Sequence, residues 1–166
     1  MAEGGAGTAA ALREGVIAIA EAAAAAILEV YRGSFEVIHK ADASPLTRAD
    51  LAAHHCIVDG LARLTPDIPV LSEESAHLVE TETRRGWRRL WLVDPLDGTR
   101  EFVKRNGEFS VNIALIEDGV AVLGVIQAPV TGVLWYGAQG DGAFRRDGDG
   151  ERPLRVRAPA NPPLRV

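Results

Sequence analysis

The sequence contains one cysteine, Cys56, so an intramolecular disulfide cannot form, which agrees with a reducing compartment. It also lacks a long uninterrupted apolar run, because Arg13, Glu14, Glu21 and Glu29 interrupt the Ala-rich N-terminal segment. No basic region precedes that segment. These absences argue against a secretory signal and a transmembrane helix, and the sequence favours a cytoplasmic protein.

Positive charge is scarce as well. The 18 Lys and Arg residues face 23 Asp and Glu residues, which gives a formal net charge of −5. This balance argues against a general surface for nucleic acids or anionic membranes, although it leaves room for a local pocket that binds a small phosphate. The 166 residues, 47% apolar and 25% charged, are typical of one soluble globular domain.

Common metal and nucleotide motifs are missing. His54 and His55 are adjacent on an expected helix, where their side chains diverge by about 100°. His39 and His77 have no cysteine or carboxylate at zinc-ligand spacing, and Gly5-Ala6-Gly7 has no strand before it. We therefore expect neither a zinc site nor a dinucleotide-binding turn, and we interpret His54 and His55 as structural or exposed.

The apolar spacing predicts an α+β fold in which two long helices pack on a mostly antiparallel sheet. Residues 1–7 are predicted to be a flexible terminus, the two long helices to span residues 8–31 and 47–64, and residues 76–86 to be a variable helix or loop. The expected strands are residues 35–39, 68–71, 88–93, 109–116, 120–126, 133–136, 142–144 and 153–156. The Asp118-Gly119 pair is a strong hairpin signal.

One stretch carries a chemical signal. Asp94-Pro95-Leu96-Asp97-Gly98-Thr99 follows an apolar, β-branched run that reads as a buried strand. Pro95 is expected to end the strand, and Gly98-Thr99 to open a short helix through residue 103. Two carboxylates and the Leu96 carbonyl can then converge on one hard cation, while the N–H groups of Gly98 and Thr99 face a phosphate.

The single residues also have plainer interpretations. Asp97 or Thr99 can simply cap the short helix, and Asp50 can simply interact with the dipole of the second long helix. Lys104 and Arg105 are interpreted as solvated charges, with a substrate contact as the alternative. The six-residue run as a whole nevertheless favours a shared metal and phosphate site.

Residues 94–99, with Leu71-Ser72-Glu73-Glu74 upstream, resemble the signature of the inositol-monophosphatase-like superfamily of magnesium-dependent, lithium-sensitive phosphatases. Residues 40–50 and 100–115 are similar to its bacterial 3'(2'),5'-bisphosphate nucleotidase branch, which hydrolyses adenosine 3',5'-bisphosphate to AMP and is linked to sulfur assimilation. The similarity runs from about Leu12 to the last residue. It implies the N-terminal part of a layered α/β/α/β/α sandwich.

The resemblance also implies a metal site with two or three Mg²⁺ ions. Glu73, Asp94 and the Leu96 carbonyl would bind one ion, and Asp94 and Asp97 would supply part of a second. A water molecule activated by the metal would be the nucleophile.

The same resemblance assigns the catalytic and phosphate-binding residues. Asp50 would polarise Thr99, and the pair would orient the attacking water or accept its proton, with Glu73 as the third catalytic residue. The expected phosphate-binding residues are Leu96, Asp97, Gly98 and Thr99.

The resemblance divides the chain into a metal- and phosphate-binding domain, residues 8–158, and the start of a truncated second domain, residues 159–166. In the family this second domain carries a Trp-Asp pair whose Asp completes the metal site, and the sequence has no such pair. We therefore expect activity from an intact parent protein and low activity from the 166 residues alone. Apolar surface left by a missing domain would favour association, but the sequence does not define an oligomeric state.

Three functions follow from these observations. The leading one is a magnesium-dependent bisphosphate nucleotidase that acts on a small phosphorylated nucleotide and not on nucleic acid. The second is an inositol or sugar monophosphatase of the same superfamily. The third is a noncatalytic metal- or phosphate-binding fragment.

Overall fold

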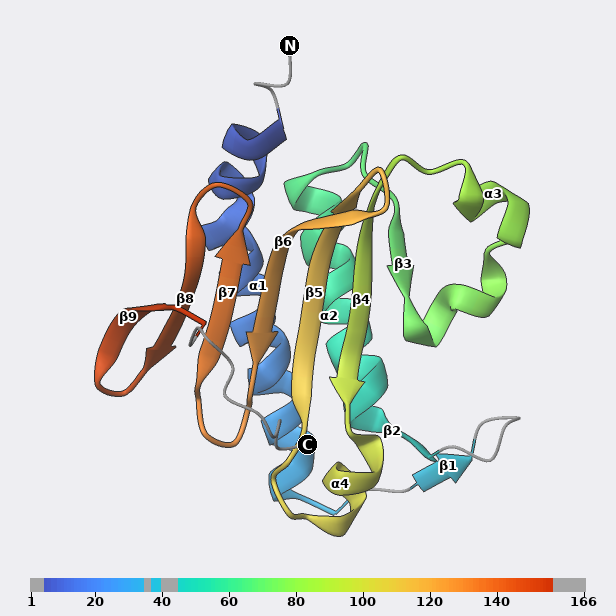
Figure 1. The fold of residues 1–166 in the computed structure, drawn as a ribbon. Helices are drawn as coiled ribbons and strands as arrows, with labels where there is room; N and C mark the ends of the chain where they lie inside the picture. Colours follow the sequence, from blue (N-terminus) through green and yellow to red (C-terminus); the bar gives the residue numbers. More distant parts are fainter. Residues whose placement is uncertain (1–4, 35–36, 40–44, 157–166) are drawn as a thin grey trace, which may run out of the picture.

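The computed structural model describes residues 5–34, 37–39 and 45–156, and shows helices and strands in an α+β arrangement (Figure 1). The helical elements are α1 (Gly5–Arg32), α2 (Arg48–Leu64), a 3-10 helix η1 (Glu73–Leu78), α3 (Thr81–Arg85) and α4 (Thr99–Lys104). The strands are β1 (Val37–His39), β2 (Pro45–Thr47), β3 (Val70–Ser72), β4 (Arg89–Asp97), β5 (Ser110–Glu117), β6 (Val120–Gln127), β7 (Leu134–Ala138), β8 (Gly142–Asp147) and β9 (Gly150–Leu154). No helix in these ranges is long and apolar enough to cross a membrane.

The main sheet has the strand order β3-β4-β5-β6-β7-β8-β9. Only β3 and β4 run parallel, and every other neighbouring pair is antiparallel. The β5–β6 hairpin turns through Asp118 and Gly119, whose φ angles of 47° and 82° suit the tight turn that Asp-Gly pairs favour. The predicted mostly antiparallel sheet and its hairpin are confirmed.

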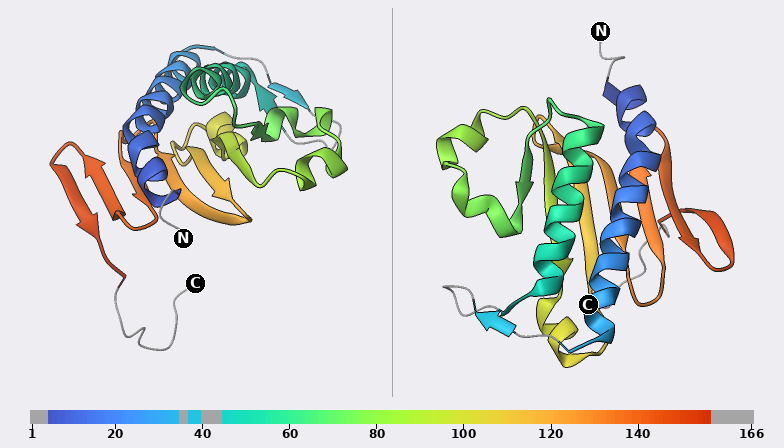
Figure 2. Two further views of the ribbon diagram at one scale, coloured as in Figure 1. Left: turned by 90° about the horizontal axis from the view of Figure 1, so that it is seen from above. Right: turned by 180° about the vertical axis from the view of Figure 1, so that it is seen from behind.

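Helices α1 and α2 lie side by side on one face of this sheet (Figure 2). Side chains alternate across a strand, so β4 places Trp91 and Val93 under the helices while Leu92 faces away and is 47% exposed. The helices contribute fully buried residues such as Ile27 and Ile57 to the same core. The two predicted long helices are therefore confirmed as the cover of one sheet face.

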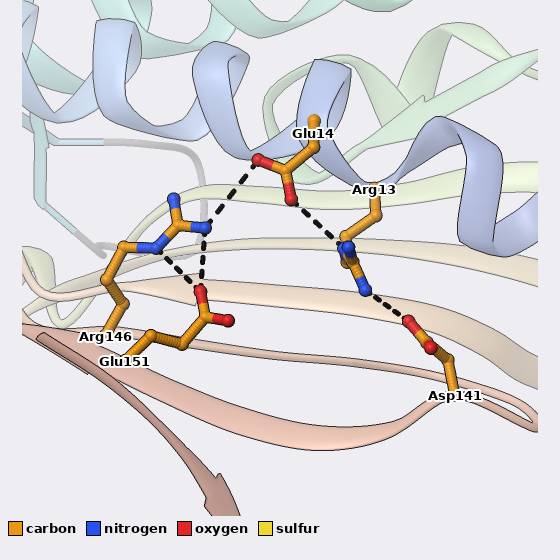
Figure 3. Close-up of polar contacts among 5 residues, drawn as sticks. All are labelled: Arg13, Glu14, Asp141, Arg146 and Glu151. Carbon is orange, nitrogen blue, oxygen red and sulfur yellow. Dashed lines mark hydrogen bonds and ion pairs between the residues drawn. The ribbon is translucent and has the colours of Figure 1, made fainter.

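Charged side chains connect α1 to the outer strands (Figure 3). Arg13 pairs with Asp141 in the β7–β8 turn, and Arg146 of β8 lies 2.9 Å from Glu151 of β9 and 3.7 Å from Glu14 of α1. Because these groups are partly exposed, each pair stabilises the fold only slightly. Together they link α1 to β8, β9 and the β7–β8 turn.

Several expected boundaries differ from the structure. Helix α1 begins at Gly5, three residues before the expected start at residue 8, although Gly5 and Gly7 have low helix propensity. Residues 1–4 and 159–166, assigned from sequence to a terminus and a truncated domain, lie outside the described residues, as do residues 35–36 of the first expected strand. Residues 76–86 divide between η1 and α3.

The largest correction concerns Pro95, which does not end its strand. β4 continues to Asp97, and its pairing with β5 shifts register between Asp94 and Asp97. Proline has no N–H to donate, so it is tolerated in a strand where the ladder is irregular.

Candidate metal and phosphate site

The register shift in β4 brings two carboxylates to the same face of the sheet. Asp94 pairs with Asn112, and Asp97 pairs with Ser110, so four residues of β4 stand opposite three of β5. In a regular strand, residues three positions apart point to opposite faces, but a bulge with one extra residue restores them to the same face. Asn112 confirms this placement, because its Nδ2 donates a hydrogen bond to Asp97 Oδ2 at 3.1 Å.

Asp94 lies in an environment that disfavours its charge. Burial, followed by the negative charges of Glu73 and Asp97, raises the pKa of Asp94 to about 7. Its Oδ1 is buried and has no hydrogen-bond partner among the described residues. Glu73 reaches this position because β3 runs parallel to β4, which places Ser72 opposite Val93.

A hard divalent cation fits this arrangement. It would neutralise the gathered carboxylates and give the Asp94 Oδ1 atom a partner, and Mg²⁺ prefers oxygen ligands while keeping several waters. Within residues 5–34, 37–39 and 45–156, no three Asp, Glu, His or Cys side chains form a complete ligand cluster. A cation would therefore also need carbonyl, water or substrate oxygens.

The predicted pair of Asp50 and Thr99 is brought together. Asp50 is only 1% exposed, and its Oδ1 accepts a hydrogen bond from the Thr99 hydroxyl at 2.9 Å. The same hydroxyl lies 3.2 Å from the Leu96 carbonyl oxygen. Asp50 Oδ2 accepts from the backbone N–H and the hydroxyl of Thr47, at 2.7 Å and 2.6 Å, within a capping box. Asp50 thus joins the start of α2 to the start of α4, which follows β4.

Gly98 is required by its backbone conformation and by its neighbours. Its φ is +94°, and a Cβ at this position would lie 2.9 Å from the Glu108 carbonyl oxygen. Gly98 is the N-cap of α4, and no side chain caps this helix. The interpretation of Asp97 or Thr99 as a simple helix cap is therefore wrong.

A pocket of about 700 Å³ opens beside the acidic residues on the sheet face that α1 and α2 leave uncovered. Glu73, Asp94 and Asp97 lie along its wall, and Leu92 and Ile126 contribute apolar surface. A ligand with a charged group and an apolar body would meet both kinds of wall.

Sequence reasoning missed three polar contacts around the site. Arg105 is not a solvated charge: its guanidinium donates to the carbonyl oxygens of Tyr31 and Gly33, both at 2.6 Å, at the end of α1. Gly33, two residues after the predicted helix end at residue 31, was the available signal for such a cap, because glycine commonly follows the last residues of a helix. Lys104 is exposed, as expected, and lies 3.5 Å from Glu101.

The other two contacts are that of His54 with Ser72 and the hydrogen bond, described above, that Asn112 donates to Asp97. His54 Nδ1 lies 2.8 Å from the Ser72 hydroxyl, while His55 is exposed. Burial, and then the neighbouring His55, lower the pKa of His54, which favours the neutral ring. Neither contact had a signal in sequence, because both depend on which residues face each other across elements.

The chain combines an α+β sheet, a bulged strand with acidic residues and a contact between Asp50 and Thr99. The sequence profile of the inositol monophosphatase family matches residues 9–164, which include all of these features. The chain belongs to this family. Among curated relatives, it is 53% identical over 155 residues to the 3'(2'),5'-bisphosphate nucleotidase CysQ of Salmonella typhimurium, covering 92% of this chain and 61% of that protein. It is 52% identical over 153 residues to CysQ of Escherichia coli K12, with coverages of 91% and 61%.

Solved structures show the same relationship. The crystal structure of CysQ from Bacteroides thetaiotaomicron has 43% identity and a TM-score of 0.72, covering 92% of this chain and 54% of that one. The IMPase of Thermotoga maritima has 30% identity and a TM-score of 0.73, with coverages of 87% and 53%. The chain therefore spans about 61% of the length of the curated relatives named above.

Proposed function

We propose that this chain is the metal- and phosphate-binding part of a magnesium-dependent 3'(2'),5'-bisphosphate nucleotidase. It would release the 3'-phosphate of adenosine 3',5'-bisphosphate and leave AMP. The observation that supports this most directly is the buried Asp94 Oδ1, which has no hydrogen-bond partner in the described ranges, on a side chain that also experiences the negative charges of Glu73 and Asp97. The similarity to CysQ proteins supports the nucleotide as substrate.

The proposed ligands follow the arrangement of the acidic residues. Glu73, Asp94 and the Leu96 carbonyl would hold one Mg²⁺, and Asp94 and Asp97 would contribute to a second, within a total of two or three ions. Bound Mg²⁺ would neutralise phosphate charge and make water a stronger nucleophile.

The remaining chemistry is assigned to this chain's own residues. Asp50 Oδ1 holds the Thr99 hydroxyl proton, so a lone pair of Thr99 Oγ is left to accept a hydrogen bond from the attacking water. The N–H groups of Gly98 and Thr99 are proposed to bind phosphate oxygens as charge moves during the transfer. Water attacks phosphorus, the bond to the ribose 3'-oxygen breaks, and that oxygen takes up a proton.

An inositol or sugar monophosphatase is the second candidate. It is favoured by the likeness to the Thermotoga maritima IMPase, whose TM-score of 0.73 matches that of the CysQ structure within 0.01. A noncatalytic binding fragment is the third, because the described residues lack a complete carboxylate cluster. We propose slow turnover for the 166 residues alone, a cytoplasmic location and a role in sulfur assimilation.

The decisive experiment measures phosphate release from adenosine 3',5'-bisphosphate and from inositol 1-phosphate, with Mg²⁺, with and without Li⁺. Asp94→Asn is expected to lower the Mg²⁺-dependent rate about a hundredfold or more, since metal charge stabilisation supplies several kcal/mol. Asp118→Asn is the matched control, because Asp118 is an exposed acid in the β5–β6 turn and asparagine tolerates its φ of 47°.

Faster release from the nucleotide than from inositol 1-phosphate would support the nucleotidase. The reverse preference would support the monophosphatase instead. Equal Mg²⁺-dependent rates for Asp94→Asn and the unsubstituted chain would overturn the proposed site. Absence of release in every sample, with Mg²⁺ still raising the melting temperature, would favour the binding fragment.

A further inference from the structure

Ser72 stands at a position where serine usually caps a helix, yet it does not. It is the residue immediately before η1, with extended φ and ψ of −101° and 143°, and its side chain makes no capping hydrogen bond. Such a cap usually contributes about 1 kcal/mol. The side chain is instead completely buried, and its hydroxyl lies 2.8 Å from His54 Nδ1. Ser72 therefore makes a contact with α2 in place of a capping hydrogen bond to η1.

This contact holds the end of β3 from two directions. Pairing with Val93 fixes the backbone of Ser72 against β4, and His54 fixes its side chain against α2. The next residue is Glu73, whose negative charge acts on Asp94. The direction in which the chain leaves Ser72 therefore sets the point from which the Glu73 side chain extends.

His54 lies one helical turn after Asp50 on α2, so the two side chains share a helix face. Asp50 fixes Thr99 beyond the bulge in β4, and His54 fixes Ser72 before Glu73. One helix thus contacts residues on both sides of the acidic site.

We propose that His54 is a positioning residue for the metal site, which acts through Ser72 on the carboxylate of Glu73. This inference rests on the proposed function, because it requires that Glu73 bind a cation. His54 itself contacts neither the cation nor the substrate in this proposal.

The test measures Mn²⁺ affinity by the electron paramagnetic resonance signal of free Mn²⁺, a readout independent of turnover. Residues that orient metal ligands typically change affinity about 10- to 100-fold, and His54 acts one residue further away, so His54→Ala is expected to weaken Mn²⁺ binding about three- to tenfold. Ser72→Ala should give a similar loss, and the double variant should add little to either single variant. His54→Asn should recover affinity, because the asparagine amide can occupy the place of Nδ1.

Two control variants separate positioning from loosening of α2. His55→Ala alters the exposed neighbour and should leave affinity unchanged. Ile57→Ala removes a fully buried side chain of the same helix and should lower stability while the affinity per folded molecule stays constant.

Unchanged Mn²⁺ affinity in His54→Ala, with binding by the unsubstituted chain intact, would overturn the inference and leave the proposed function standing. A loss in Ile57→Ala as large as that in His54→Ala would also overturn it. Failure of the unsubstituted chain to bind Mn²⁺ would overturn the proposed metal site, and the inference with it.

Discussion

The helix-covered face of the sheet and the acidic end of β4 are built from the same strand but by opposite rules. Under α1 and α2, Trp91 and Val93 are buried at 0% and 2% exposure among other apolar side chains. At the very next residue, Asp94, a buried oxygen has no hydrogen-bond partner within the described part of the chain, and the pKa is raised to about 7. Burial of the first region lowers the free energy of the folded state, whereas burial of charge in the second raises it. Unfavourable charge next to a well-packed core is typical of a binding site prepared for an opposite charge.

The largest expected effect comes from a substitution in the helix-covered core. Ile57→Ala removes a fully buried side chain between α2 and the sheet, and should lower the free energy of unfolding by about 3 kcal/mol. Urea unfolding followed by circular dichroism measures the change. Leu51→Ala on the same helix, where Leu51 is 39% exposed, is the control and should lose much less. Equal losses would show that α2 does not form the core that the structure describes.

A smaller effect is expected where the covered core meets the site. Arg105→Ala removes two hydrogen bonds from α4 to the end of α1, and hydrogen bonds to charged groups contribute about 1.5–3 kcal/mol each when buried. Because Arg105 is exposed, we expect a total loss of about 1–2 kcal/mol. Lys104→Ala, at the neighbouring exposed residue, should be close to neutral. Thermal unfolding of both variants tests this, and a loss in Lys104→Ala equal to that in Arg105→Ala would contradict the cap.

The comparison also explains what could be predicted from sequence. The covered face was predictable because apolar spacing reports directly on burial, so the two helices and the β5–β6 hairpin are confirmed. Asp94 and Asp97 were predicted as site residues because both belong to the continuous run from Asp94 to Thr99, whereas Glu73 was assigned through the family resemblance. The bulge was not predicted, because proline interrupts the hydrogen-bond ladder both where a strand ends and where its pairing shifts register.

Contacts between distant segments had no such signal. Arg105 and His54 looked like solvated or structural residues, because nothing near them in the sequence shows that Tyr31 or Ser72 lies within reach. A polar residue gains its role from its partner across the fold, and a single sequence does not show that partner. The roles proposed for Asp50, Thr99 and the acidic residues remain predictions for the same reason. The structure shows where these side chains lie, and measurements of activity and metal binding test the roles.

The last prediction concerns the acidic end of β4, where a substitution is expected to raise the stability of the protein and not to lower it. Asp94→Asn should stabilise the metal-free protein by about 1–2 kcal/mol, because the amide keeps the shape of the side chain without its buried charge. The pKa of Asp94 is higher in the folded state than its ordinary value of 3.8, so the charged form opposes folding fully above pH 7. The gain should therefore be largest at pH 8 and disappear as the pH falls towards 4, where the wild-type carboxyl is protonated in both states. Chemical unfolding in a chelating buffer at several pH values measures this gain. A variant that is less stable than the wild type at pH 8 would show that the Asp94 carboxylate stabilises the fold. The expected gain in stability would show that the charge of Asp94 destabilises the metal-free protein, as a cation-binding role requires.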